Sequence, residues 1–319
     1  MEIKIKAKPD RDDYSSLRYR VTPFSAAGHY PRGIFSFPTA AFVADEEVVF
    51  AVTHCSTWRS QEDLPYSEVD WMKPELVRLL GSLMFCERFT ERRCCFYPRV
   101  HADVILGNDH LDLQDHGCIS QIKAAVIGDK RFTSPAPSKS EWQGVGEGYL
   151  FDPGELNIDL CDAYWQRIST SNLLLMRGIQ ALVKCDMLAK HEEFQEESAI
   201  AAFIALDASF EMIRRHLQSE GVPNPSAADA AMWFHNAFDA HFGYPPPADG
   251  KFFGDFYPQR IQTLHPGSRL GDAPFAALSI DDRIHLRQSL PGLFAYLLTG
   301  VHSPDWLDWI AEAQRNMYS

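Results

Sequence analysis

Arg260 and His265 are the two side chains whose types and spacing best suit contact with a phosphate group. They lie in the stretch 253–271, FGDFYPQRIQTLHPGSRLG, and the proline after the histidine ends any helix that carries them. Five residues is about one and a half helical turns, so the two side chains point from neighbouring faces and can bracket one phosphate. The same spacing arises by chance in a chain with 12 histidines, so its meaning depends on the surrounding elements.

Other residue groups contain the side chains of possible metal or nucleotide sites. Those with metal-ligand side chains are His54-Cys55, Cys94-Cys95 and the group His101, His110, His116 and Cys118. None has paired C-x-x-C or H-x-x-x-H spacing, so buried thiols and surface histidines are the better interpretation, and we expect no metal and no cofactor. The glycines of the stretch QGVGEGYL do not lie between a strand and a helix, as a nucleotide-binding loop requires, and indicate a flexible turn.

Composition is typical of a globular protein that remains in the cytoplasm. The 319 residues suffice for two domains, and 45% are hydrophobic and 23% charged. No apolar run has the length of a membrane span, and the start, MEIKIKAKPD, lacks the apolar core of a signal peptide. The seven cysteines follow no disulfide framework, so we expect reduced thiols.

The net charge of −13 is concentrated in the second half of the chain. Residues 1–150 carry 18 Lys+Arg and 21 Asp+Glu, whereas residues 151–319 carry 12 and 22. A general DNA- or RNA-coating protein would have the opposite sign, because phosphate contacts provide most non-specific affinity. We therefore expect any polyanionic partner to be bound at a local site.

Residues 1–150 are expected to form an α+β domain with an antiparallel sheet. Alternating or short apolar runs predict strands at 2–8, 34–44, 47–55, 94–106 and 118–128, with a hairpin at Asp45-Glu46. The intervening residues up to Arg32 have an irregular pattern. Pro74 followed by leucines on one face predicts a helix over 74–89. The role that fits such an added domain is that of a sensor or recognition module.

Residues 156–319 are expected to form an all-α helical bundle. Helical spacing of apolar residues predicts helices over 159–188, 192–220, 226–242, 252–265, 281–298 and 304–317. Ser226 is the expected cap of the third helix, and Gly221 with the prolines beyond it ends the second.

Within this half, residues of about 160–300 resemble HEPN-type helical domains, in particular the Apea-like members that follow larger N-terminal regions. The resemblance rests on three stretches: SAIAAFIALDASFEMIRRHLQSEGVPNPSAADAAMWF, DFYPQRIQTLHPGSRLG and DDRIHLRQSLPGLFAYLLTG. These domains carry an arginine, a gap of four to six residues and a histidine late in the bundle, and Arg260 and His265 match that pattern. Ile261 and Pro266 depart from the family, in which a polar residue follows the arginine and a small, helix-continuing residue the histidine.

The resemblance implies a metal-independent endoribonuclease of defence or stress responses, active as a homodimer whose bundles share one cleft. His265 would act as general base or acid on a ribose 2′-hydroxyl, and Arg260 would hold the phosphate as charge builds on it. Arg269 is a further expected phosphate contact outside the family motif. RNA is then the expected polyanionic partner.

Two other interpretations remain open at this point. In the first, Arg260 pairs with an acid such as Asp255, His265 caps the helix C-terminus, and the bundle is a non-catalytic scaffold for dimerisation or for a nucleotide or other ligand. In the second, a metal-dependent enzyme resides in the N-terminal half.

Overall fold

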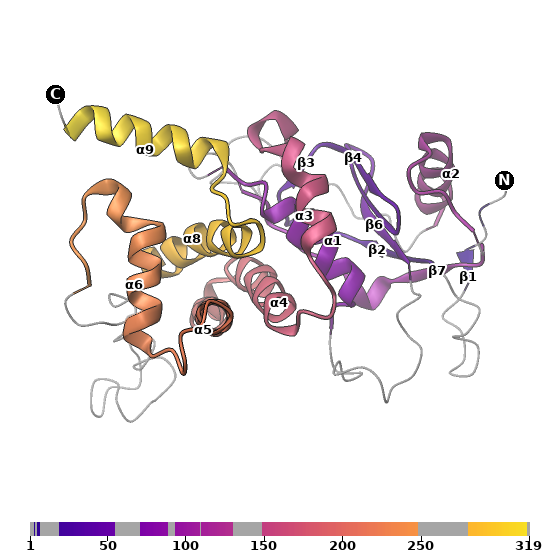
Figure 1. The fold of residues 1–319 in the computed structure, drawn as a ribbon. Coiled ribbons are helices and arrows are strands. Elements are labelled where there is room, and N and C mark those ends of the chain that lie inside the picture. The colour runs from indigo at the N-terminus through magenta and orange to yellow at the C-terminus, as the bar shows by residue number, and fades with distance from the viewer. Residues whose placement is uncertain are drawn as a thin grey trace. The chain divides into compact units, whose positions relative to one another are not determined.

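A computed structural model places the chain in two compact units, which we describe separately (Figure 1). The first unit comprises Met1–Cys86 and Arg92–Thr170, and the second comprises Glu87–Glu91 and Ser171–Ser319. The residues that the structure describes are 3, 5–6, 19–54, 71–88, 93–108, 110–129, 149–247 and 280–317.

The predicted fold class is confirmed: an antiparallel sheet with helices is followed by a helical region. The sheet of the first unit has its strands in the order β1 (Ile5–Lys6), β7 (Val104–Leu106), β2 (Tyr19–Pro23), β6 (Val49–His54), β5 (Ala40–Ala44) and β4 (Gly33–Phe37). All neighbours in this sheet are antiparallel. A separate parallel pair joins β3 (Tyr30–Pro31) to β8 (Leu150–Phe151).

Two tight hairpins set the register of the central strands. The predicted turn at Asp45-Glu46 joins β5 to β6, and the Asp45 side chain accepts hydrogen bonds from the backbone N–H groups of Glu47 and Val48. The single run predicted over 34–44 is instead two strands, because the chain turns between Phe37 and Ala40.

Helices cover both faces of this sheet. The face that carries Val21, Val43 and Val52 packs against α2 (His116–Ile127) through a buried core that includes Ile119 and Ile122. Helix α1 (Pro74–Met84) begins at Pro74 as predicted but ends before the predicted residue 89. It packs on β5 and β6 and against α3 (Cys161–Arg167). Short 3₁₀ turns complete the unit: η2 (Val100–Ala102), η3 (Pro153–Glu155) and η4 (Ile158–Leu160).

The strand predicted over 118–128 is wrong, because these residues belong to helix α2. The Asp115 side chain caps that helix by accepting hydrogen bonds from the N–H groups of Gly117 and Cys118. The buried side chains, at 118, 119, 122 and 126, follow the helical period. The irregular character predicted before Arg32 is also wrong in part, since β2 lies there, between β6 and β7.

The second unit is built from helices. They are α4 (Leu173–Leu188), α5 (Gln195–Ser219), α6 (Ala227–Ala237), α8 (Ile280–Thr299) and α9 (Pro304–Met317), with 3₁₀ turns η5 (Glu192–Phe194) and η6 (Asp239–Phe242). The helix predicted over 159–188 is divided between α3 and α4. The Ser226 cap is confirmed, since Ser226 and Asp229 form a capping box.

Helix α5 lies at the centre of this unit and packs against both α4 and α8. Its buried face is rich in alanine, including Ala201, Ala202 and Ala205, which lets the neighbouring helices approach closely. None of the helices in the described ranges is long and apolar enough to cross a membrane.

Gly178 of α4 lies close against α8. A Cβ atom at this position would lie 2.5 Å from the Cζ atom of Phe294, a residue that is fully buried. In contrast, a Cβ at Gly292 of α8 would meet nothing within 4 Å.

These two helical glycines give a matched pair for a stability test. We expect Gly178→Ala to destabilise the unit by about 1–2 kcal/mol, because overpacking against Phe294 outweighs the gain in helix propensity. Gly292→Ala should stabilise it by about 0.5–1 kcal/mol, since only the propensity gain applies. Denaturant midpoints of both variants check this, and a stabilising Gly178→Ala would contradict the packing of α4 against α8.

Candidate functional site

The predicted site residues Arg260, His265 and Arg269 lie outside the described residues, as do the helix predicted over 252–265 and the neighbours Ile261 and Pro266. In sequence, the described elements on either side of them are η6 and α8. The chain leaves η6 through Gly243, whose φ of 75° is the left-handed conformation that ends helices. The surroundings of the predicted site must therefore be built from the helices that flank it.

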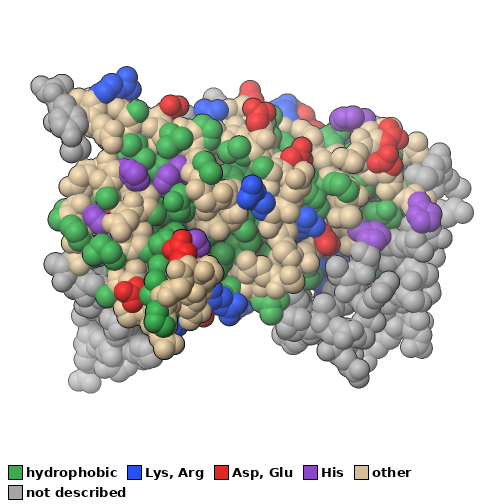
Figure 2. All heavy atoms as spheres, in the orientation of Figure 1, with side chains coloured by type: hydrophobic (Ala, Val, Ile, Leu, Met, Phe, Trp, Pro, Cys, Tyr) green, Lys and Arg blue, Asp and Glu red, His purple; other side chains and the backbone are tan. Residues whose placement is uncertain are grey.

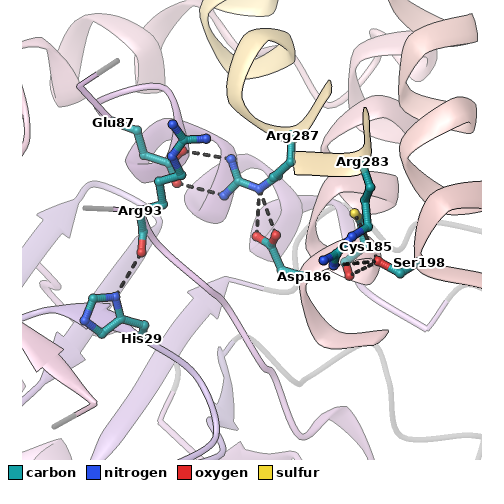
Figure 3. Close-up of polar contacts among 8 residues, drawn as sticks. All are labelled: His29, Glu87, Arg93, Cys185, Asp186, Ser198, Arg283 and Arg287. Atoms are coloured by element: carbon teal, nitrogen blue, oxygen red, sulfur yellow. Dashed lines mark hydrogen bonds and ion pairs between the residues drawn. The ribbon is translucent and has the colours of Figure 1, made fainter. Parts of the chain in front are cut away.

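A buried arginine, Arg287 of α8, forms the principal charged centre of the second unit (Figure 3). Its Nε donates to both carboxylate oxygens of Asp186 on α4, at 2.9 and 2.8 Å. Its two terminal nitrogens donate to the two oxygens of Glu87, each at 2.8 Å. One guanidinium is thus shared by two carboxylates in the bidentate geometry that suits arginine.

Burial and charge determine the protonation of this centre. Burial by itself disfavours the charged guanidinium, but the two carboxylates outweigh it and raise the pKa of Arg287 well above its ordinary value. Burial raises the pKa of the Asp186 carboxyl, and the attraction of Arg287 offsets this effect only in part. Arg287 therefore stays a cation whose charge is neutralised by the two carboxylates, so it is a structural group.

Arg283 lies one helical turn before Arg287, near the start of α8, and has a different environment. Its Nη1 donates to the hydroxyl of Ser198 at 3.2 Å, and that hydroxyl donates to the backbone oxygen of Cys185 at 2.8 Å (Figure 3). Burial raises the pKa of the Cys185 thiol to about 11, and the Asp186 carboxylate adds to this shift. A thiol held in its protonated form is a poor nucleophile, so this polar layer joins α4, α5 and α8 without offering covalent chemistry.

A second cluster, of aromatic rings around His302, joins η6 and the end of α8 to α9. The His302 ring stacks on Tyr296, with centroids 4.4 Å apart, and on Trp306 at 5.6 Å. Phe238 meets His302 edge-on at 5.1 Å. Histidine and hydrophobic side chains gather on the surface over α6 and α9 in Figure 2. Burial lowers the pKa of His302, the nearby His241 lowers it further, and a hydrogen bond to the Ala237 backbone opposes both.

Of the possible metal ligands in the first half, Cys55 lies outside the described residues, and the others form no group suited to a metal ion. Cys94 and Cys118 are buried, while His101, His110 and His116 are exposed. Among the described residues, no group of three or more His, Cys, Asp or Glu side chains is arranged to hold a metal ion. Buried His29 donates from Nδ1 to the backbone oxygen of Arg93 (3.1 Å) and packs on Phe151, so it acts within the core (Figure 3).

No protein-family model, curated protein or solved structure matches the chain. The similarity of residues 160–300 to HEPN-type domains therefore remains a prediction from the residues that carry it.

Sequence reasoning missed the Arg287 centre. The two partners lie 101 and 200 positions away along the chain, so no local spacing reveals them. One signal was present: Arg287 falls between Leu286 and Leu290, on the face of α8 that the apolar pattern assigns to the core.

Replacing Arg287 by methionine should destabilise the protein by about 3–5 kcal/mol near neutral pH, because two buried carboxylates lose their counter-charge. An acid whose folded-state pKa exceeds its unfolded value loses stabilising effect as pH rises through the folded-state pKa. Asp186 already has a raised pKa, and removing Arg287 removes the attraction that opposes it. We therefore expect the cost of Arg287→Met to be larger at about pH 8 than at about pH 5.

Urea unfolding at the two pH values measures this difference. The exposed Arg177 on α4 provides the control, since Arg177→Met should change stability by less than about 0.5 kcal/mol at either pH. Adding Asp186→Asn and Glu87→Gln to Arg287→Met should recover part of the loss and its pH dependence. A pH-independent loss would show that packing, not charge, makes Arg287 important.

His302 gives a second pH test, of opposite sign. A histidine whose pKa is lowered by folding resists protonation, so stability falls as pH drops below the ordinary value of 6.5. We expect His302→Phe, which keeps a ring between Tyr296 and Trp306, to reduce the loss of stability between about pH 7.5 and 5.5. The exposed His285 on α8 is the control, and an unchanged slope in His302→Phe would contradict this role.

Proposed function

We propose that the second unit is a HEPN-like, metal-independent endoribonuclease that acts as a homodimer. The observation that supports this best is the order of elements: α4, α5 and α6 precede the segment with Arg260 and His265, and α8 follows it. An Arg-x4-His motif late in a helical bundle is the arrangement on which the resemblance rests. Defence or stress response is the accompanying role.

The chemistry proposed for this site needs only the side chains of the motif. A neutral imidazole at His265 takes the proton of a ribose 2′-hydroxyl, and the resulting oxygen attacks the adjacent phosphorus. The guanidinium of Arg260 binds the phosphate oxygens as negative charge develops, and Arg269 provides a second contact. The acidic composition of residues 151–319 means that such binding depends on these local cations and weakens with salt.

One arginine of α8 can be set aside as a phosphate ligand. Arg287 is neutralised by Glu87 and Asp186, so it is not available to a phosphate. The proposed phosphate contacts are Arg260 and Arg269 of the segment 253–271. The first unit, whose sheet has helices on both faces, is proposed as a recognition module.

A non-catalytic scaffold is the second candidate, and the charge of the chain favours it. Residues 151–319 carry 12 Lys+Arg against 22 Asp+Glu, which repels RNA at long range. In this case the bundle would bind a second copy of itself or a ligand other than RNA.

An RNA-cleavage assay in EDTA separates the two candidates. We expect the wild-type protein to cleave mixed RNA, and His265→Ala and Arg260→Ala each to lower the rate by about 100-fold or more. Arg260→Lys should restore little, because lysine cannot bind the phosphate in bidentate fashion. Light scattering on the same samples measures whether the protein and its variants are dimers.

The matched controls come from described, exposed positions of the same unit. His285→Ala and Arg177→Ala remove the same side-chain types and should leave cleavage unchanged. Absence of cleavage by a folded wild-type dimer, or cleavage that survives both motif substitutions, would exclude the enzyme and favour the scaffold.

A further inference from the structure

Two buried thiols of the first unit share one hydrogen-bond acceptor, the backbone oxygen of Ser82 in α1. The Cys86 Sγ donates to this oxygen at 3.2 Å, and the Cys161 Sγ donates to it at 3.8 Å. The two sulfurs are therefore separated by no more than the sum of these distances, 7.0 Å. Both side chains are buried, with exposed fractions of 0% for Cys86 and 5% for Cys161.

The backbone around the two thiols is held in register by independent contacts. The N–H of Asn157 donates to the Cys86 oxygen at 2.8 Å, just ahead of the turn that leads into α3. Phe85 packs edge-on against Tyr164, with ring centroids 5.9 Å apart. Arg78 of α1 donates from Nε and Nη2 to the Trp165 oxygen, at 3.0 and 2.7 Å. Helices α1 and α3 thus lie side by side (Figure 1). Cys86 follows the end of α1, and Cys161 is the first residue of α3.

We propose that Cys86 and Cys161 form an oxidisable dithiol, which closes to an intramolecular disulfide in the folded protein. Both sulfurs lie within hydrogen-bond reach of one oxygen, and rotation about the two Cα–Cβ bonds changes the distance between the sulfurs, which a disulfide brings to about 2.0 Å. The proposal does not depend on the ribonuclease hypothesis, since both residues belong to the first unit.

The oxidant in this proposal is hydrogen peroxide. The sulfur of Cys161, the more accessible of the two thiols, attacks one peroxide oxygen; the O–O bond breaks, a sulfenic acid forms, and the other oxygen leaves with the thiol proton as one water. The Cys86 sulfur then attacks the Cys161 sulfur, the S–O bond breaks, and the hydroxyl leaves with the Cys86 proton as a second water. The two sulfurs lose two electrons to one peroxide, and a dithiol reductant reverses the change.

The expected consequence is a covalent link between the end of α1 and the start of α3. Because the bridge closes a long loop, we expect oxidation to raise the unfolding temperature by roughly 5 °C.

The test is peptide mapping of the native protein after treatment with peroxide, under non-reducing conditions. We expect a Cys86–Cys161 linked peptide as the main intramolecular product, lost on reduction with dithiothreitol. Cys86→Ser and Cys161→Ser should each abolish it and the rise in unfolding temperature. Cys185→Ser removes a buried thiol of the second unit, and the linked peptide should persist in it.

Two outcomes would overturn the proposal. One is oxidation of the native protein without the Cys86–Cys161 peptide. The other is cross-links distributed among all cysteines as in urea-unfolded protein, which would show that the native fold does not select this pair. The wild-type map alone decides between them, so the conclusion does not depend on either serine variant folding well.

Discussion

The burial of one cation, Arg287, is the constraint on which the second unit depends. A buried charge is costly unless opposite charges and hydrogen bonds compensate it. Here α4 provides Asp186, and Glu87 comes from the short segment that the chain contributes from far earlier in the sequence. The packing of α4 and α8 around α5 must therefore satisfy a fixed set of polar contacts as well as an apolar core. Such a requirement selects one arrangement of helices among several that would bury the same apolar area.

How far the sequence predicts this fold depends on the range of the interactions involved. Helices α8 and α9 were predicted almost to the residue, because their apolar period, the glycine after α8 and the proline that opens α9 are local signals. The run that forms helix α2 predicts a strand instead, since a short and largely apolar run fits both periods until the Asp115 cap is recognised. Strand β2 is stabilised by β6 and β7, which lie far along the chain, so its local pattern conveys little.

At the candidate site too, local features can be predicted from the sequence and long-range contacts cannot. The spacing of Arg260 and His265 is local and could be read directly, whereas the polar layer of Arg283, Ser198 and Cys185 is formed only when three helices assemble. Arg287 and the motif arginine, Arg260, are assigned different partners. Arg287 is committed to carboxylates within the protein, and the motif arginine is proposed for a phosphate from outside. In the proposed ribonuclease, the motif arginine would bind the substrate while Arg287 serves the fold.

Pro291 lies inside helix α8 and removes one of its backbone hydrogen bonds. Proline has no N–H, so the carbonyl four residues earlier, that of Arg287, receives no hydrogen bond from position 291. The backbone hydrogen bonding of α8 is thus interrupted at the carbonyl of Arg287, the residue whose side chain is bound by two carboxylates. Residues 280–287 are therefore joined to the remainder of the helix by a turn that lacks one backbone hydrogen bond. The ion pairs of Arg287 hold this part of the helix to Asp186 and Glu87.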